Sequence, residues 1–289
     1  MTDRHETLVD AATVAAHHAD ADWVVVDVRF ALADAAFGRA QWTAGTIPGA
    51  RFADLDHDLS APVQPGVTGR HPLPTPETFA VTLGHWGITP ASQVVAFDQM
   101  GGAFAARLWW MLRWVGHRAV AVLDGGWDAW TDGGHPVAPG AESWGATPAY
   151  PVNVDATMTV DAATVAAAHD DDAVAVFDAR GADRYRGDNE TTDPVAGHIP
   201  GADSLPFADN FAAGKRMRGA DELRARFEAA LAGRDPAKAI AYCGSGVTAC
   251  HDILAMTHAG LATPRLYPGS WSEWIVDAAR AKATGPERG

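Results

Sequence analysis

The strongest constraint on the fold is an internal repeat that spans most of the chain. Residues 9–16 read VDAATVAA, and residues 160–167 repeat them letter for letter. A repeat of this length that occurs twice, with its further motifs in the same order, predicts two tandem copies of one domain rather than a solenoid. The further matches pair the strands that end in Asp27-Val-Arg29 and Asp178-Ala-Arg180, the turns Gly45-Thr-Ile-Pro-Gly49 and Gly197-His-Ile-Pro-Gly201, the strands that end at Asp98 and Cys243, and the segments around Trp127 and Trp271.

Within each copy, short apolar strands alternate with stretches of helical periodicity, such as residues 75–83, 104–114 and 222–231. This alternation is typical of a parallel sheet with helices on both faces, so the predicted fold class is α/β. We expect an N-terminal domain over residues 1–138 and a C-terminal domain over residues 156–289. Residues 139–155, where periodicity fades, are the expected linker.

Composition and net charge limit the cellular compartment and the classes of binding partner that we expect for this chain. The 289 residues are 47% hydrophobic and include 11 Trp, which is ample for two cores, and the formal net charge is −14. This charge argues against nucleic acid or an anionic membrane as partner. No basic-then-apolar leader and no apolar run of about 20 residues is visible. Two cysteines seven residues apart fit neither a disulfide framework nor a zinc pair. We therefore expect a cytoplasmic protein without metal or cofactor.

Cys243 ends an apolar run, residues 239–242, and precedes a loop of small residues and a helical pattern over 251–258. At the carboxyl edge of a parallel sheet, backbone N–H groups of Gly244, Gly246, Val247 and Thr248 can form a nest for an anion. The following helix adds the positive end of its dipole, which also favours a thiolate. The alternative is a buried structural cysteine.

The first copy has Asp98 in place of the cysteine. Its loop, residues 99–104, carries no nucleophile, and we expect that it cannot act as a thiolate cup. The first domain is therefore expected to be catalytically silent.

Together, the tandem copies, the paired Asp-x-Arg strands, the Gly-His-Ile-Pro-Gly turn and the single Cys-Gly-Ser-Gly-Val-Thr loop resemble the two-domain rhodanese superfamily. Within it, the loop is similar to that of 3-mercaptopyruvate sulfurtransferases. The resemblance implies that Cys243 takes a sulfane sulfur from a small donor, 3-mercaptopyruvate or thiosulfate, and becomes a persulfide. The sulfur then passes to cyanide or to a thiol, such as a thioredoxin-like protein or a small dithiol.

The resemblance also implies further site residues. A hydroxyl at Ser245 would suit proton transfer to an enolate leaving group. Asp56 and His71 match the family's carboxylate and histidine, although from the residues alone they are a solvated loop acid and a turn residue. Arg184 matches the arginine that holds the donor carboxylate. The second arginine of animal relatives is missing from residues 188–194, so Arg186 or another residue would replace it.

Three alternatives remain to be weighed. A Cys-x5-Arg phosphatase is excluded, because Ala249 stands where its arginine is required. A thiosulfate sulfurtransferase is the main alternative, although its loop usually places cations after the cysteine, where this chain has Gly244 and Ser245. A non-catalytic sulfur carrier or binding module is the third. We interpret Arg29 and Arg180 as structural and Cys250 as a half-buried helix cysteine.

Overall fold

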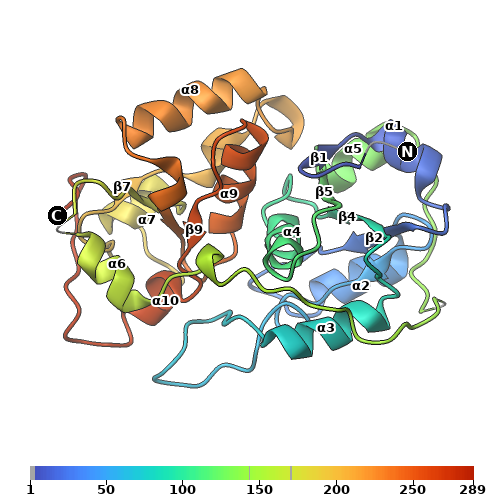
Figure 1. The fold of residues 1–289 in the computed structure, drawn as a ribbon, viewed down its shortest axis with the longest axis horizontal. Helices are drawn as coiled ribbons and strands as arrows, with labels where there is room; N and C mark the ends of the chain where they lie inside the picture. Colours follow the sequence, from blue (N-terminus) through green and yellow to red (C-terminus); the bar gives the residue numbers. More distant parts are fainter. Residues whose placement is uncertain (1–3, 143, 170) are drawn as a thin grey trace. The chain divides into compact units, whose positions relative to one another are not determined.

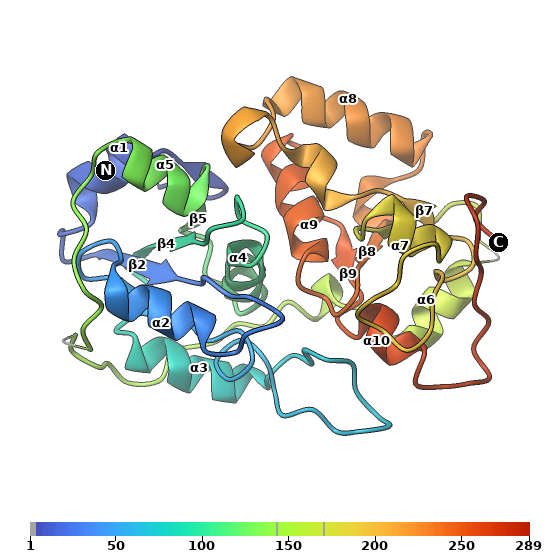
Figure 2. The same ribbon diagram turned by 180° about the vertical axis from the view of Figure 1, so that it is seen from behind.

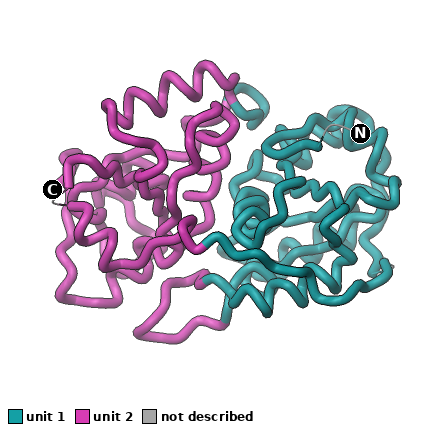
Figure 3. Tube along the Cα trace, viewed as in Figure 1, with its two compact units in different colours: residues 1–61, 73–155, 212–217 teal, residues 62–72, 156–211, 218–289 magenta. Residues whose placement is uncertain are grey.

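A computed structural model describes residues 4–142, 144–169 and 171–289. The chain forms two compact units (Figure 3). Unit 1 contains residues 1–61, 73–155 and 212–217, and unit 2 contains residues 62–72, 156–211 and 218–289. Residues 62–72 thus belong to the first half by sequence but pack within unit 2.

Unit 1 is built on a five-stranded sheet whose paired strands all run parallel. Its strands are β1 (Leu8–Val9), β2 (Trp23–Asp27), β3 (Arg51–Phe52), β4 (Gln93–Phe97) and β5 (Val120–Leu123), and its helices are α1 (Ala11–His17), α2 (Phe37–Ala44), α3 (Pro76–His85), α4 (Ala105–Trp114), α5 (Gly126–Asp132) and the 3₁₀ turn η3 (Ala213–Lys215).

The order of these strands is β1-β5-β4-β2-β3. Alternate strand residues such as Val25 and Val95 pack with Val14 of α1 and Trp130 of α5 on one face. Figures 1 and 2 show α1 and α5 on one side of this sheet and α2, α3 and α4 on the other. Because strand residues alternate in direction, two helical layers can bury both faces of these nearly all-apolar strands.

Unit 2 repeats this plan on a four-stranded parallel sheet. Its strands are β6 (Val176–Asp178), β7 (Asp203–Ser204), β8 (Ile240–Tyr242) and β9 (Arg265–Leu266), its helices are α6 (Ala162–Ala168), α7 (Ala182–Arg186), α8 (Ala220–Leu231), α9 (Ala249–His258) and α10 (Ser270–Trp274), and its 3₁₀ turns are η1 (Ala156–Met158), η2 (Phe207–Asn210) and η4 (Pro236–Lys238).

The strand order in unit 2, β7-β6-β8-β9, matches β3-β2-β4-β5 of unit 1. The counterpart of β1 is reduced to a single parallel bridge between Thr159 and Leu266. Helices α6 and α10 cover one side of this sheet, and α8 and α9 lie on the other (Figures 1 and 2). The predicted α/β class, with two parallel sheets each covered on both faces, is confirmed.

The repeated motifs form one cluster in each unit. In unit 2, Arg180 donates to Asp178 at 2.6 Å and to the carbonyl oxygen of Gly197 at 2.7 Å. Its guanidinium lies 4.9 Å from the ring centre of Trp271. A buried ion pair needs such additional partners to offset desolvation, so the Asp-x-Arg pair has the structural role expected from the sequence. The unit 1 counterparts are Arg29, Asp27, Gly45 and Trp127.

The exact repeat also has a local cause. Asp10 and Asp161 are the N-caps of α1 and α6, and each accepts from the backbone N–H of a threonine three residues later. The expected linker, residues 139–155, holds no helix or strand where the structure describes it (139–142 and 144–155), and it packs as part of unit 1. Tyr150 N–H, for example, donates to Ala80 O at 2.9 Å.

Within the described residues, no helix has the length and apolarity required to cross a bilayer.

Candidate active site

The loop that follows β8 is fixed by the turn at the start of α10. Cys243 is buried, and its N–H donates to Ser270 Oγ at 3.1 Å. Its carbonyl oxygen accepts from the N–H of Trp271 at 3.0 Å. Gly246 has φ +77°, and a Cβ there would lie 2.4 Å from Pro268 O. Only glycine fits at position 246, so the backbone path around the cysteine is tightly specified.

Unit 1 shows what this loop geometry can hold. The carboxylate of Asp98 is fully buried and accepts from four backbone N–H groups at 2.7–2.9 Å. Burial raises the pKa of Asp98, while these four donors act in the opposite direction. This loop thus forms an anion cup around its own carboxylate, and the expectation that it cannot act as a thiolate cup stays a prediction, since it carries no cysteine. The donors belong to Met100, Gly102, Phe104 and Ala105.

Met100, Gly102 and Phe104 of unit 1 correspond in the repeat to Ser245, Val247 and Ala249 of unit 2. Fixed N–H dipoles of this kind suit a sulfur anion as well as a carboxylate. Gly244, Gly246, Val247 and Thr248 were predicted as the nest. By analogy with unit 1, the N–H groups of Ser245 and Ala249 are further candidate donors beside that of Val247, and the predicted nest stays a prediction.

Two of the predicted catalytic side chains meet in unit 2. His71 Nδ1 lies 2.7 Å from Ser245 Oγ, and both residues are buried. The contact forms because residues 62–72 pack within unit 2. A histidine at this distance can accept or return the proton of the hydroxyl.

Asp56 lies in unit 1, where its N–H donates to Asp54 Oδ1 at 2.9 Å. Burial and the neighbouring charge of Asp54 raise the pKa of Asp56. Its part in the site stays a prediction.

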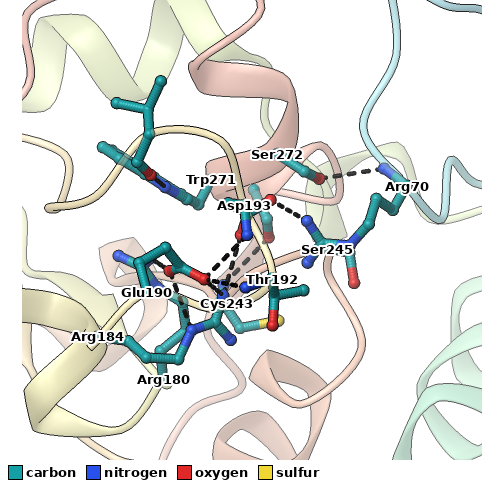
Figure 4. Close-up of polar contacts among 12 residues, drawn as sticks. Arg70, Arg180, Arg184, Glu190, Thr192, Asp193, Cys243, Ser245, Trp271 and Ser272 are labelled. Atoms are coloured by element: carbon teal, nitrogen blue, oxygen red, sulfur yellow. Dashed lines mark hydrogen bonds and ion pairs between the residues drawn. The ribbon is translucent and has the colours of Figure 1, made fainter. Parts of the chain in front are cut away.

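Arg184, at the end of α7, faces the loop and is held by two acids (Figure 4). Its Nε donates to Glu190 at 3.0 Å, and its Nη2 donates to Glu190 and to Asp193, each at 2.9 Å. Both Nη1 and Nη2 lie 3.7 Å from the position that a Cβ on Gly244 would occupy. The arginine predicted to hold the donor carboxylate is thus next to the cysteine loop.

Arg186, unlike Arg184, is not among the side chains next to Gly244 in the cysteine loop. Within the described residues, the carboxylate that Arg186 bonds is Asp188, at 2.7 Å, and this pair is well exposed. Its assignment to the donor site stays a prediction without a supporting contact.

Arg70 is the second cation beside the loop, and the sequence reasoning missed it. Its Nη2 lies 2.8 Å from the Cβ position of Gly244, and its Nη1 bonds Asp193 (Figure 4). Its backbone N–H donates to Ser272 Oγ at 3.1 Å. The available signal was its place directly before His71, a residue already assigned to the site.

Cys250 also differs from its expectation. It is completely buried in the first turn of α9, and its Sγ donates to the carbonyl oxygen of Gly246 at 3.4 Å. It therefore supports the loop rather than lying half-exposed on a helix.

Comparisons with known proteins agree with this architecture. The rhodanese-like domain matches twice, over residues 10–132 and 161–277. A probable 3-mercaptopyruvate sulfurtransferase of Pseudomonas aeruginosa is 48% identical over 96% of this chain and 98% of its own length. A putative thiosulfate sulfurtransferase of Mycobacterium tuberculosis is 35% identical over 99% of both chains.

Among solved structures, 3-mercaptopyruvate sulfurtransferase from Leishmania major superposes with a TM-score of 0.82. It is 32% identical, and the match covers 93% of this chain and 74% of that one. The chain belongs to the rhodanese family, with two rhodanese-like domains in tandem. Its most similar relatives named here are sulfurtransferases.

Proposed function

We propose that this protein is a 3-mercaptopyruvate sulfurtransferase that works through a persulfide on Cys243. The observation that carries the proposal is the grouping of a cysteine, in a loop that corresponds to the anion cup of Asp98, with a Ser245–His71 pair and two arginines beside Gly244. The high identity to the Pseudomonas relative over nearly the whole chain supports the same donor.

In the first half-reaction the Cys243 thiolate attacks the thiol sulfur of 3-mercaptopyruvate. A sulfur–sulfur bond forms and the carbon–sulfur bond breaks, and its electron pair stays on the carbon as the enolate of pyruvate. The proton of the donor thiol moves to that carbon through the Ser245 hydroxyl, which exchanges it with His71 at 2.7 Å. The products are pyruvate and an anionic persulfide, held by the loop N–H groups.

In the second half-reaction an acceptor takes the outer sulfur and restores the thiolate. Cyanide becomes thiocyanate, and a thiol becomes a persulfide. A dithiol can then release hydrogen sulfide as its second thiol closes a disulfide. A thioredoxin-like protein or a small dithiol in the cytoplasm is the acceptor class we propose.

Thiosulfate is the second candidate donor, and it would leave as sulfite. The name of the Mycobacterium relative favours it, as do two arginines near the loop. Against it, the residues directly after the cysteine, Gly244 and Ser245, are neutral, whereas thiosulfate carries two charges.

The test compares initial rates with the two donors, using cyanide and a dithiol as acceptors. We expect kcat/KM to be higher for 3-mercaptopyruvate. Mass spectrometry after donor treatment should show one added sulfur on Cys243, and Cys243→Ser should lower turnover by at least about a thousandfold. A sulfur adduct on Cys250, or a higher kcat/KM for thiosulfate, would contradict the proposal.

A further inference from the structure

Ser270, the first residue of α10, has a backbone conformation that residues other than glycine rarely adopt. Its φ is +55°, and it is completely buried. Among the described residues, two further non-glycines have positive φ, Lys215 and Ala232, and both are exposed. The left-handed region is strained for any residue with a Cβ, so a buried serine there needs a contact that offsets the strain.

The repeat shows that the turn itself does not require a side chain at this position. The counterpart of Ser270 in unit 1 is Gly126, the first residue of α5, with φ +57°. A Cβ at Gly126 would lie 2.3 Å from the backbone oxygen of Asp98, so unit 1 has no room for a serine. The same turn therefore carries glycine in the unit without the cysteine and a strained serine in the unit with it.

The hydroxyl of Ser270 joins the cysteine to the link between β9 and α10. Its Oγ accepts from the N–H of Cys243 at 3.1 Å and donates to the carbonyl oxygen of Tyr267 at 3.0 Å. Because the hydroxyl proton points at Tyr267, a lone pair is left for the cysteine N–H. The N–H of Tyr267 in turn donates at 3.0 Å to Ala241 in β8, two residues before the cysteine. A glycine could make neither of the two side-chain contacts.

The two residues after Ser270 bind the same stretch of backbone. The N–H of Trp271 donates to the carbonyl oxygen of Cys243 at 3.0 Å, and that of Ser272 donates to Gly244 at 2.9 Å. Both the N–H and the carbonyl group of the cysteine are thus held by α10. The tryptophan bond has a counterpart in unit 1, from Trp127 at 2.8 Å, whereas the hydroxyl contact depends on a side chain that unit 1 lacks.

We propose that Ser270 is a positioning residue for the nucleophile, because its hydroxyl fixes the peptide that precedes the Cys243 side chain. This inference rests on the proposed sulfurtransferase function and adds to it a residue outside the cysteine loop on which the rate depends. Sulfur transfer requires the attacking sulfur, the donor sulfur and the leaving carbon to be aligned, and rotation of the peptide would move the attacking sulfur. Asp98 needs no such hydroxyl, since four N–H groups hold its carboxylate.

Loss of the hydroxyl should lower the rate of sulfur transfer and leave donor binding unchanged, because the buried side chain of Ser270 offers no surface to a ligand. In a single turnover with 3-mercaptopyruvate, we expect Ser270→Ala and Ser270→Gly to release pyruvate at least about tenfold more slowly at saturation. The half-saturating concentration should stay within about twofold of wild type. A wild-type rate in either folded variant would overturn the proposal, as would a change confined to the half-saturating concentration.

The two variants separate the strain from the hydrogen bond. Both lose the hydroxyl, but only glycine relieves the left-handed conformation, so the urea midpoint of Ser270→Gly should lie above that of Ser270→Ala. The matched control is Ala232→Gly, which relieves a φ of +49° at the exposed end of α8. It should raise the urea midpoint and leave the rate unchanged. A rate that simply follows the urea midpoint across the three variants would show a purely structural role for Ser270.

Amide hydrogen exchange tests the contact without turnover. In the protein without donor, the N–H of Cys243 should exchange at least about tenfold faster in Ser270→Ala and Ser270→Gly than in Ala232→Gly. Equal exchange in all three variants overturns the proposal even if the wild type is an active sulfurtransferase. Faster exchange in both Ser270 variants, with a wild type that turns over neither 3-mercaptopyruvate nor thiosulfate, overturns the proposed function and leaves the Ser270 contact standing.

Discussion

Gly244 is the residue of the cysteine loop that lies next to Arg70 and Arg184. A Cβ at this position would come within 2.8 Å of Arg70 Nη2, the end of a flexible side chain. At Gly246 the obstacle is instead the backbone oxygen of Pro268, combined with a positive φ. These two glycines are therefore needed for different reasons, one for ligand binding and the other for backbone conformation.

We expect Gly244→Ala to raise KM for 3-mercaptopyruvate about tenfold, because the methyl group displaces Arg70, with little loss of stability. Gly246→Ala should instead lower the free energy of unfolding by about 2 kcal/mol or more. Steady-state kinetics and urea unfolding of both variants check this. A wild-type KM in a folded Gly244→Ala protein would show that Arg70 does not contact the donor.

Asp252 is a second residue with a measurable signature, and it lies in the first half of α9. It is fully buried, and its Oδ1 accepts from Asn210 at 2.7 Å. Burial raises the pKa of Asp252 to about 7. The folded protein therefore holds this proton at pH values where the unfolded chain has already lost it, and stability falls as pH rises from about 4 to 7.

We expect wild type to lose about 2–3 kcal/mol relative to Asp252→Asn between pH 5 and pH 8. Urea unfolding of both proteins at the two pH values measures the difference. Parallel pH profiles for the two proteins would mean that Asp252 stays ionised in the fold.

At the scale of elements, the loop between β4 and α4 is the most instructive. Three of its N–H groups and that of Ala105, at the start of α4, point at one carboxylate, which is the kind of arrangement that the proposed persulfide would need in unit 2. The sequence could not predict this, because the direction of an N–H group depends on loop dihedrals that small residues leave open. The paired motifs did predict the strands, the helices and the Asp–Arg clusters, since these follow from periodicity and burial.

Asp98→Ala should therefore destabilise the protein by about 3 kcal/mol or more, because four buried N–H groups lose their acceptor. Turnover by the folded fraction should stay near wild type, since unit 1 has no nucleophile in this loop. Urea unfolding followed by kinetics at low temperature checks both parts. Asp98→Asn, which keeps one acceptor oxygen, should lose less stability, and a stable variant with greatly reduced kcat would contradict this prediction.

At the scale of the whole molecule, the sequence predicted two domains of one fold, and the structure places most of the candidate site residues in unit 2. Cys243, Ser245 and Arg184 lie in the second copy, where the repeat and the resemblance pointed. Arg70 was missed, although it directly precedes His71, because it lies in a segment of the first half that packs within unit 2. Membership of a unit is set by tertiary contacts, and residues 62–72, which lack periodicity, gave no sign of them beyond the match of His71 to the family.

The exchange of residues 62–72 also has a genetic consequence. The first half of the chain, which has Asp98 in place of the cysteine, supplies His71 and Arg70, and these contact Ser245 and Asp193 of the second half. If the proposed site is correct, neither half can be deleted without loss of activity, because a substitution in residues 62–72 of the first half changes the contacts beside Cys243 in the second. Selection on the choice of sulfur donor would therefore act on both halves of the gene at once.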